Sequence, residues 1–164
     1  MLYIDQDTGA FQVTVDPNDS NVVYADMWEG RQGPWENGQW QGPGSGLYKS
    51  TDGGDTWSRL AGGLPTFAQG LGRIGFDIAP SYSKILYATV DSGELGGLCR
   101  SDDAGGTWVR VNSERRLISR GADFADVKVD PKDPETVYVC DTSFYRSTDG
   151  GKNFTCIKGS PGGD

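Results

Sequence analysis

Three of the five tryptophans lie close together, at positions 28, 35 and 40, in a segment rich in glycine, amide and charged side chains. Flat aromatic faces beside planar hydrogen-bonding groups suit the apolar faces and hydroxyl edges of sugars, and they also suit apolar peptide side chains. The alternative is that residues 26–46 are an insertion whose tryptophans pack for stability. Of the three, Trp28 is the one most expected to be core, because it directly continues the preceding predicted strand. The expected ligand-binding residues of this segment are Arg31, Trp35, Glu36, Asn37 and Trp40.

Arg115, Arg116 and Arg120 form a second group, a local positive cluster in an otherwise acidic chain. Guanidinium groups can hold a carboxylate or phosphate through two parallel hydrogen bonds, so these three residues are also expected to bind ligand. The alternative is that they pair with neighbouring Asp and Glu side chains.

Paired carboxylates would be needed for glycoside hydrolysis, in which two such groups flank the scissile bond about 5–10 Å apart. Acidic residues in the connecting segments are Glu29, Glu36, Asp91, Glu94, Glu114 and Asp123. None stands in a motif that matches a known catalytic position. The chain has no histidine, which excludes Ser-His and Cys-His nucleophile pairs and histidine zinc sites. No metal site and no cofactor are expected.

A repeated motif indicates which elements position these residues. Segments 50–57, 101–108 and 147–154 share the frame Ser-x-Asp-x-Gly-x-(Thr/Asn)-aromatic, starting 51 and then 46 residues apart. Self-similarity at such a period is typical of repeat architectures. Apolar segments of period two, bounded by Gly, Pro, Asn and Asp, surround each copy and predict four short strands per unit, with the motif in the last turn.

The motif resembles the Asp-box, or bacterial neuraminidase repeat, and the whole unit is similar to bacterial sortilin-like and xyloglucanase-like repeat proteins. The resemblance implies an all-β fold of three four-stranded antiparallel β-propeller blades, in one segment spanning residues 1–164. The blades are expected at about 11–61, 73–111 and 124–158, with residues 1–5 as the leftover strand of a preceding blade.

A structural role is expected for the motif itself. Its glycine permits positive φ, its aspartate accepts hydrogen bonds from turn N–H groups, and its aromatic ring returns into the core between blades. The expected structural residues are Ser50, Asp52, Gly54, Trp57, Ser101, Asp103, Gly105, Trp108, Ser147, Asp149, Gly151 and Phe154.

Blade topology places the ligand-binding candidates on one rim. In an up-and-down blade, the turns after the first and third strands lie at one end, whereas the other connections lie at the opposite end. Loops positioned by a rigid scaffold commonly carry function. The rim opposite the motif turns is therefore the expected binding face.

Propellers usually close with four to eight blades, whereas three are predicted here. Uncovered end blades would expose apolar faces, which predicts one of two arrangements. Either the chain is a segment of a larger parent, or a second copy completes a six-bladed ring.

Composition limits the partners. The formal net charge is −8, which argues against nucleic acid and membrane surfaces, and no apolar run approaches the length of a membrane helix. The N-terminus lacks a signal peptide, while the family resemblance suggests a secreted or periplasmic parent. Cys99, Cys140 and Cys156 are expected to be free, buried, small hydrophobic residues.

The expected function is a recognition module that binds a glycan or polypeptide through this rim. The alternative is a fragment of a xyloglucanase-like or sialidase-like glycoside hydrolase whose catalytic carboxylates lie partly outside this chain. The family resemblance covers both binding modules and hydrolases, so whether the chain is an enzyme stays open.

Overall fold

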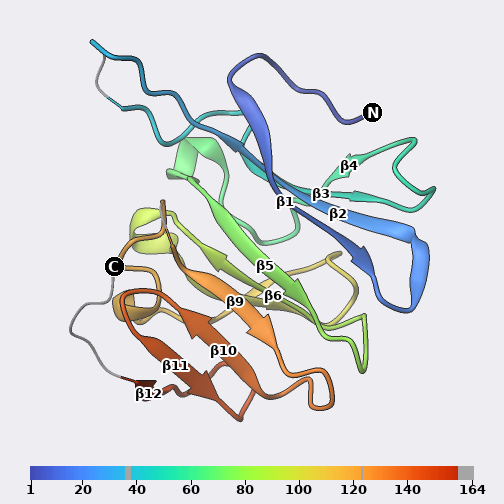
Figure 1. The fold of residues 1–164 in the computed structure, drawn as a ribbon, viewed down its shortest axis with the longest axis vertical. Helices are drawn as coiled ribbons and strands as arrows, with labels where there is room; N and C mark the ends of the chain where they lie inside the picture. Colours follow the sequence, from blue (N-terminus) through green and yellow to red (C-terminus); the bar gives the residue numbers. More distant parts are fainter. Residues whose placement is uncertain (36–37, 123, 159–164) are drawn as a thin grey trace.

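The computed structural model describes residues 1–35, 38–122 and 124–158, and it contains three four-stranded antiparallel sheets (Figure 1). Each sheet keeps its strands in chain order, which confirms the prediction of three four-stranded blades. Blade one comprises β1 (Thr8–Asp16), β2 (Asp19–Glu29), β3 (Gly46–Ser50) and β4 (Ser58–Arg59). Blade two comprises β5 (Ile74–Ile78), β6 (Leu86–Val90), β7 (Gly97–Ser101) and β8 (Val109–Asn112). Blade three comprises β9 (Asp126–Val129), β10 (Val137–Cys140), β11 (Phe144–Ser147) and β12 (Thr155–Lys158).

Burial along the strands follows the position of each blade. All five residues of β6 are buried, because blade two lies between the other two and both of its faces are covered. In β9 burial alternates instead, with Val127 and Val129 buried and Asp126 and Lys128 exposed. One face of blade three is therefore open in the described chain.

The hydrophobic core lies between sheets. Tyr24 and Leu47 of blade one pack with Phe76 and Trp108 of blade two in one cluster. A second cluster joins blades two and three in the same way, so that the middle blade contributes to both. Its members include Tyr87 and Leu98 of blade two, and Val127, Val139, Tyr145 and Phe154 of blade three.

The repeated motif forms the same hydrogen-bonded turn in each blade. In blade two the Ser101 hydroxyl donates to Asp103 at 2.8 Å, while Asp103 accepts from the backbone N–H and the hydroxyl of Thr107 at 2.7 and 2.8 Å. These bonds favour the ionised carboxylate and lower the pKa of Asp103 to about 2. Gly105 has φ +89°, a left-handed conformation that favours glycine.

The cysteines and the N-terminal residues differ in how they match the sequence predictions. Cys99 is buried, and burial raises its thiol pKa to about 11, but Cys140 and Cys156 are exposed on the third blade. The prediction that all three are buried is wrong, because no further sheet covers that blade within the described chain. Residues 1–5 form no strand with these sheets, and their assignment to a preceding blade stays a prediction. No helix in the described part of the chain has the length and apolarity to span a bilayer.

Candidate functional site

The longer connections gather at one end of the three blades (Figure 1). This loop rim contains residues 30–35, 38–45, 60–73, 91–96, 113–122, 124–125 and 141–143. It also carries three short 3-10 helices, η1 (Phe67–Gln69), η2 (Gly93–Leu95) and η3 (Arg115–Leu117). The motif turns and the turns between the first two strands of each blade lie at the opposite end, as expected from the topology.

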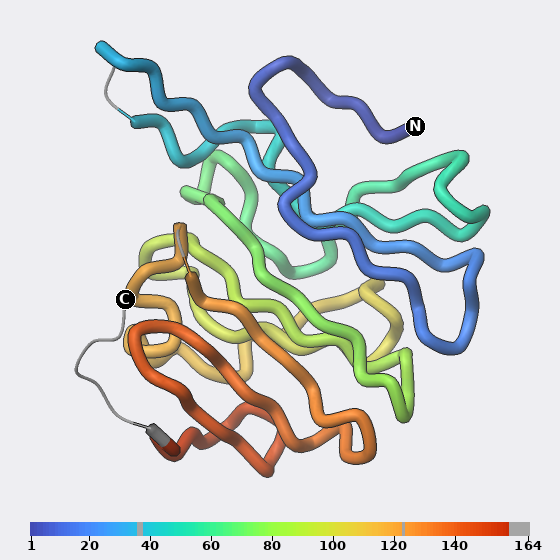
Figure 2. Tube along the Cα trace, viewed as in Figure 1, coloured from blue at the N-terminus to red at the C-terminus, as the bar shows by residue number. Residues whose placement is uncertain are grey.

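The tryptophan segment extends beyond the sheet of blade one (Figure 2). Its two arms are joined by backbone hydrogen bonds between Arg31 and Gln39, at 2.8 and 2.7 Å. Trp28 donates its indole N–H to the carbonyl of Trp40 at 2.9 Å, and the two rings stack with centroids 6.0 Å apart. The Trp28 ring also packs edge to face against Phe11, and Trp28 is half-buried. Trp28 thus contacts both Phe11 and Trp40.

Trp35 and Trp40 remain accessible, at 97% and 43% exposure. Both therefore meet one condition for ligand contact, although their binding role stays a prediction. Glu36, Asn37 and Asp123 lie outside the described residues.

Phe67 was missed by the sequence reasoning and faces the same hollow as Trp40. A hollow of about 420 Å³ is lined by Gly38, Gln39, Trp40, Gln41 and Phe67. Phe67 is 45% exposed and belongs to η1, which the Thr66–Gln69 capping box holds in place. We refer to this feature as the Trp40–Phe67 hollow. Its aromatic rings and amide side chains are groups that suit a sugar surface.

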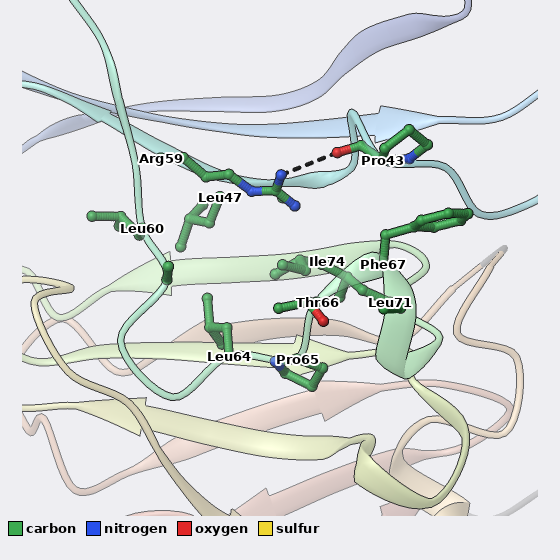
Figure 3. A pocket seen from close by; sticks show the side chains of 13 residues that line it. Pro43, Leu47, Arg59, Leu60, Leu64, Pro65, Thr66, Phe67, Leu71 and Ile74 are labelled. Atoms are coloured by element: carbon green, nitrogen blue, oxygen red, sulfur yellow. Dashed lines mark hydrogen bonds between the residues drawn. The ribbon is translucent and has the colours of Figure 1, made fainter.

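A second pocket, of about 300 Å³, also has Phe67 in its lining (Figure 3). Leu47, Leu64 and Leu71 are among its apolar lining residues, and Arg59 lies at its edge. The Arg59 guanidinium donates to the carbonyls of Pro43 and Ser45, which ties the end of the tryptophan segment to β4. Phe67 thus lines both hollows, at the connection between blade one and blade two.

The three arginines are tied to the scaffold. Arg115 donates to the carbonyl of Gly93 at 2.9 Å. Arg116 pairs with Glu114 at 2.5 Å and donates to the carbonyl of Phe154 at 2.9 Å. The Arg120 guanidinium lies 4.8 Å from the ring centre of Phe124. These contacts are with blades two and three and their connection, whereas Trp40 belongs to blade one. The structure therefore supports the pairing alternative for Arg116.

Asp91 is a partly buried carboxylate on the loop rim. Burial raises its pKa above the ordinary value, and the charges of Arg115 and Arg73 partly oppose this shift. Gly72 donates its backbone N–H to the Asp91 carbonyl at 2.7 Å. A Cβ added at Gly72 would lie 2.9 Å from the Asp91 carboxylate, and one at Gly121 would lie 2.7 Å from its Cβ. Two glycines thus leave room for this side chain.

The other described candidate residues make different contacts. Glu29 accepts the backbone N–H of Gly44 at 2.7 Å, and Glu114 pairs with Arg116. The pairing lowers the pKa of Glu114. Glu94 offers its backbone carbonyl to Arg110. Of the described candidates, Asp91 is the one whose pKa is raised.

A buried charged cluster lies beside Asp91, and sequence reasoning did not predict it. Arg73 is 2% exposed, and its guanidinium pairs with Asp126 of blade three at 2.5 Å and lies 3.9 Å from the ring centre of Phe11 in blade one. It also donates to the carbonyl of Phe124. Asp26 is fully buried nearby, and burial raises its pKa well above the ordinary value against the opposing charge of Arg73. Within the described chain, neither carboxylate oxygen of Asp26 nor Nε of Arg73 has a hydrogen-bond partner.

No family model matches the chain. It is 30% identical to a xyloglucanase of a Paenibacillus species, over 94% of this chain and 17% of that protein. It is also 30% identical to a probable oligoxyloglucan-reducing end-specific xyloglucanase of Neosartorya fischeri, over 93% of this chain and 18% of that protein. The chain thus spans about a fifth of the length of these curated relatives.

Solved structures agree on the fold. The GH74 enzyme of Niastella koreensis superimposes with a TM-score of 0.64 at 25% identity, covering 92% of this chain and 22% of that one. YCF48 from Cyanidioschyzon merolae superimposes with a TM-score of 0.58 at 14% identity, covering 94% and 41% of the two chains, which shows the fold alone. With its three stacked sheets, the chain is a β-propeller protein, and its homologues include xyloglucanases.

Proposed function

We propose that this chain supplies part of the glycan-binding rim of a xyloglucan-acting glycoside hydrolase. The observation that carries the proposal is the 30% identity to xyloglucanases over 93–94% of the chain. This reading favours the hydrolase alternative over a free-standing recognition module. We also infer that the motif turns are Asp boxes with a scaffold role, since their side chains bond within their own turns.

The Trp40–Phe67 hollow is the proposed contact for the sugar backbone. Trp40 is held from one side by Trp28, so its ring is already positioned before a ligand arrives. Pre-positioned aromatic side chains lose little conformational freedom on binding, and for that reason they contribute strongly to affinity. Gln39 and Gln41 in the same hollow supply donors and acceptors for hydroxyl groups.

Asp91 is the proposed proton-transfer carboxylate. Glycoside hydrolysis needs one carboxylic acid that keeps its proton near neutral pH, and burial of Asp91 shifts its pKa in that direction. The partner carboxylate would come from outside the described residues. Arg115 would balance the charge of Asp91 after it gives up its proton.

Binding of xyloglucan oligosaccharides, measured by isothermal titration calorimetry, tests the proposal. We expect binding that Trp40→Ala and Phe67→Ala each weaken about 5–30-fold, the range for losing an aromatic anchor of about 1–2 kcal/mol. Trp57→Phe is the matched control, because Trp57 lies in a motif turn at the opposite end and should leave affinity unchanged. Release of reducing sugar from xyloglucan, with Asp91→Asn as comparison, then tests catalysis separately. Absence of any binding to xyloglucan or cello-oligosaccharides would contradict the proposal.

A further inference from the structure

A tyrosine and a cation face each other at the same repeat position in all three blades. Tyr24 pairs with Lys49 across β2 and β3, Tyr87 with Arg100 across β6 and β7, and Tyr138 with Arg146 across β10 and β11. In each pair the cation lies over the aromatic ring, at 5.2, 5.4 and 6.0 Å from its centre. The pairing of a tyrosine with a cation is therefore repeated in all three blades.

In blades one and two this pair forms hydrogen bonds to the following blade. The Tyr24 hydroxyl and the Lys49 ammonium both donate to the carbonyl of Ala104 in blade two, at 3.0 and 2.8 Å. The Tyr87 hydroxyl donates to the carbonyl of Pro134 in blade three at 2.9 Å. Both tyrosines are fully buried by these contacts.

Arg100 adds a charge contact that Lys49 does not make. Its guanidinium binds Glu135 of blade three with two parallel hydrogen bonds, at 2.7 and 2.8 Å. Such bidentate pairs combine strength with a fixed orientation. Glu135 stands three residues before Tyr138, at the end of the turn between β9 and β10. Arg100 thus pairs with a carboxylate at a defined place in the next blade.

Blade three has the same tyrosine–cation pair on its open face. Arg146 is exposed and Tyr138 is half-buried, stacked on Phe144 with ring centres 5.6 Å apart. Lys128, opposite Tyr138 in the register, adds a second exposed cation to this face. We propose that the Tyr138–Arg146 face docks a further propeller blade that carries a carboxylate three residues before its own second-strand tyrosine.

The charge pattern argues against a second copy of this chain as the occupant. The first blade of a second copy would offer Asn21 at the position of Glu135, three residues before Tyr24. Asn21 is exposed and neutral, so it lacks the charge that Arg100 uses in the internal interface. A blade with an acidic residue at that position is the better complement to Arg146 and Lys128.

Appending a copy of residues 113–158 after residue 158 supplies such a blade, because it brings its own Glu135. In the natural chain, we expect Arg146→Ala to leave the urea midpoint unchanged. In the extended chain, the same substitution in the original third blade should lower the midpoint. The decrease should be about as large as the one that Arg100→Ala causes in the natural chain. Arg146→Ala and Glu135→Gln in the appended copy should be non-additive. An equal effect of Arg146→Ala in both chains, or no effect in either, would overturn the proposal.

If the appended blade fails to fold, Asn21→Glu in the natural chain tests the same chemistry, because it gives blade one the missing carboxylate. Sedimentation should then show self-association that is absent from the natural chain and from Asn21→Gln, and that Arg146→Ala abolishes. Monomeric behaviour of Asn21→Glu would overturn the proposal. So would association of the natural chain that Arg146→Glu disrupts, since the occupant would then be a second copy.

Discussion

Trp108 and Trp57 occupy the same position of the repeated motif but differ in what covers them. Each indole N–H donates to a carbonyl of its own turn, Gly105 at 3.0 Å and Gly54 at 2.9 Å. Trp108 is 5% exposed and packs in the core between blades one and two. Trp57 is half-buried, because no blade precedes blade one in the described chain. The pair separates the packing between blades from the hydrogen bond within the turn.

We expect Trp108→Ala to lower the free energy of unfolding by about 3–5 kcal/mol, the range for removing a large buried aromatic side chain. Trp57→Ala should cost only about 1–2 kcal/mol, in proportion to the smaller apolar area removed from water. For a chain of this length, about 2–4 °C in Tm per kcal/mol makes the difference easy to measure. Trp108→Phe keeps most of the ring volume and should lie between the two.

Urea unfolding followed by far-ultraviolet circular dichroism at pH 7 gives the three values under one set of conditions. The slope of unfolding should stay constant across the variants, so that midpoints compare directly. Equal losses for Trp108→Ala and Trp57→Ala would refute the reasoning. That result would mean that the ring stabilises its own turn and that packing between blades contributes little.

Three further predictions concern charged groups. Because burial raises the pKa of Asp26, the folded state retains the Asp26 proton to a higher pH than the unfolded state does. The free energy of unfolding of the natural chain therefore falls as pH rises from about 4 through the folded-state pKa. Asp26→Asn should therefore have the same urea midpoint as the natural chain near pH 4 and an increasingly higher one toward pH 8. A difference in midpoint that does not change with pH would contradict this role for the Asp26 charge. The Asp103 pKa is lowered to about 2, so its contribution is present above about pH 4 and lost as pH falls toward 2. Asp103→Asn should lower the urea midpoint at pH 7, and this deficit should disappear at pH 2. A deficit that does not change with pH would mean that the loss comes from the altered side-chain shape and not from the lost charge. Arg73→Met should lower the free energy of unfolding by about 3–5 kcal/mol, because it leaves Asp26 buried without an opposing charge and Asp126 without its ion pair. Adding Asp26→Asn to this variant should reduce the loss.

The strands and motif turns could be predicted from sequence because their causes are local. Alternation of apolar residues sets which face of a strand is buried, and the Ser-x-Asp-x-Gly frame supplies the turn's own donors and acceptors. The Tyr24, Tyr87 and Tyr138 positions repeat for the same reason. Burial of a particular residue was harder to predict, as the exposed Cys140 and Cys156 show, because it depends on whether another blade covers that face.

The candidate site was predictable only in part. Trp35 and Trp40 could be identified from their crowding in one connection. Phe67 could not, because its relation to Trp40 depends on how two connections fold over blade one. The sequence signal available for Phe67 was the Thr66–Gln69 spacing of a capping box, which indicates an ordered turn but not its neighbours.

Arg73 links the loop rim to the assembly of blades. It precedes β5 in blade two, yet its guanidinium contacts Phe11 of blade one and Asp126 of blade three. A change in the packing angle between any two blades must therefore move one of its partners. Asp91 lies beside this arginine, and the charge of Arg73 is one of the influences on its pKa. Covering the open face of blade three should consequently affect the rim as well as stability, because the contacts that fix the blades also set the electrostatic environment of the proposed proton-transfer carboxylate.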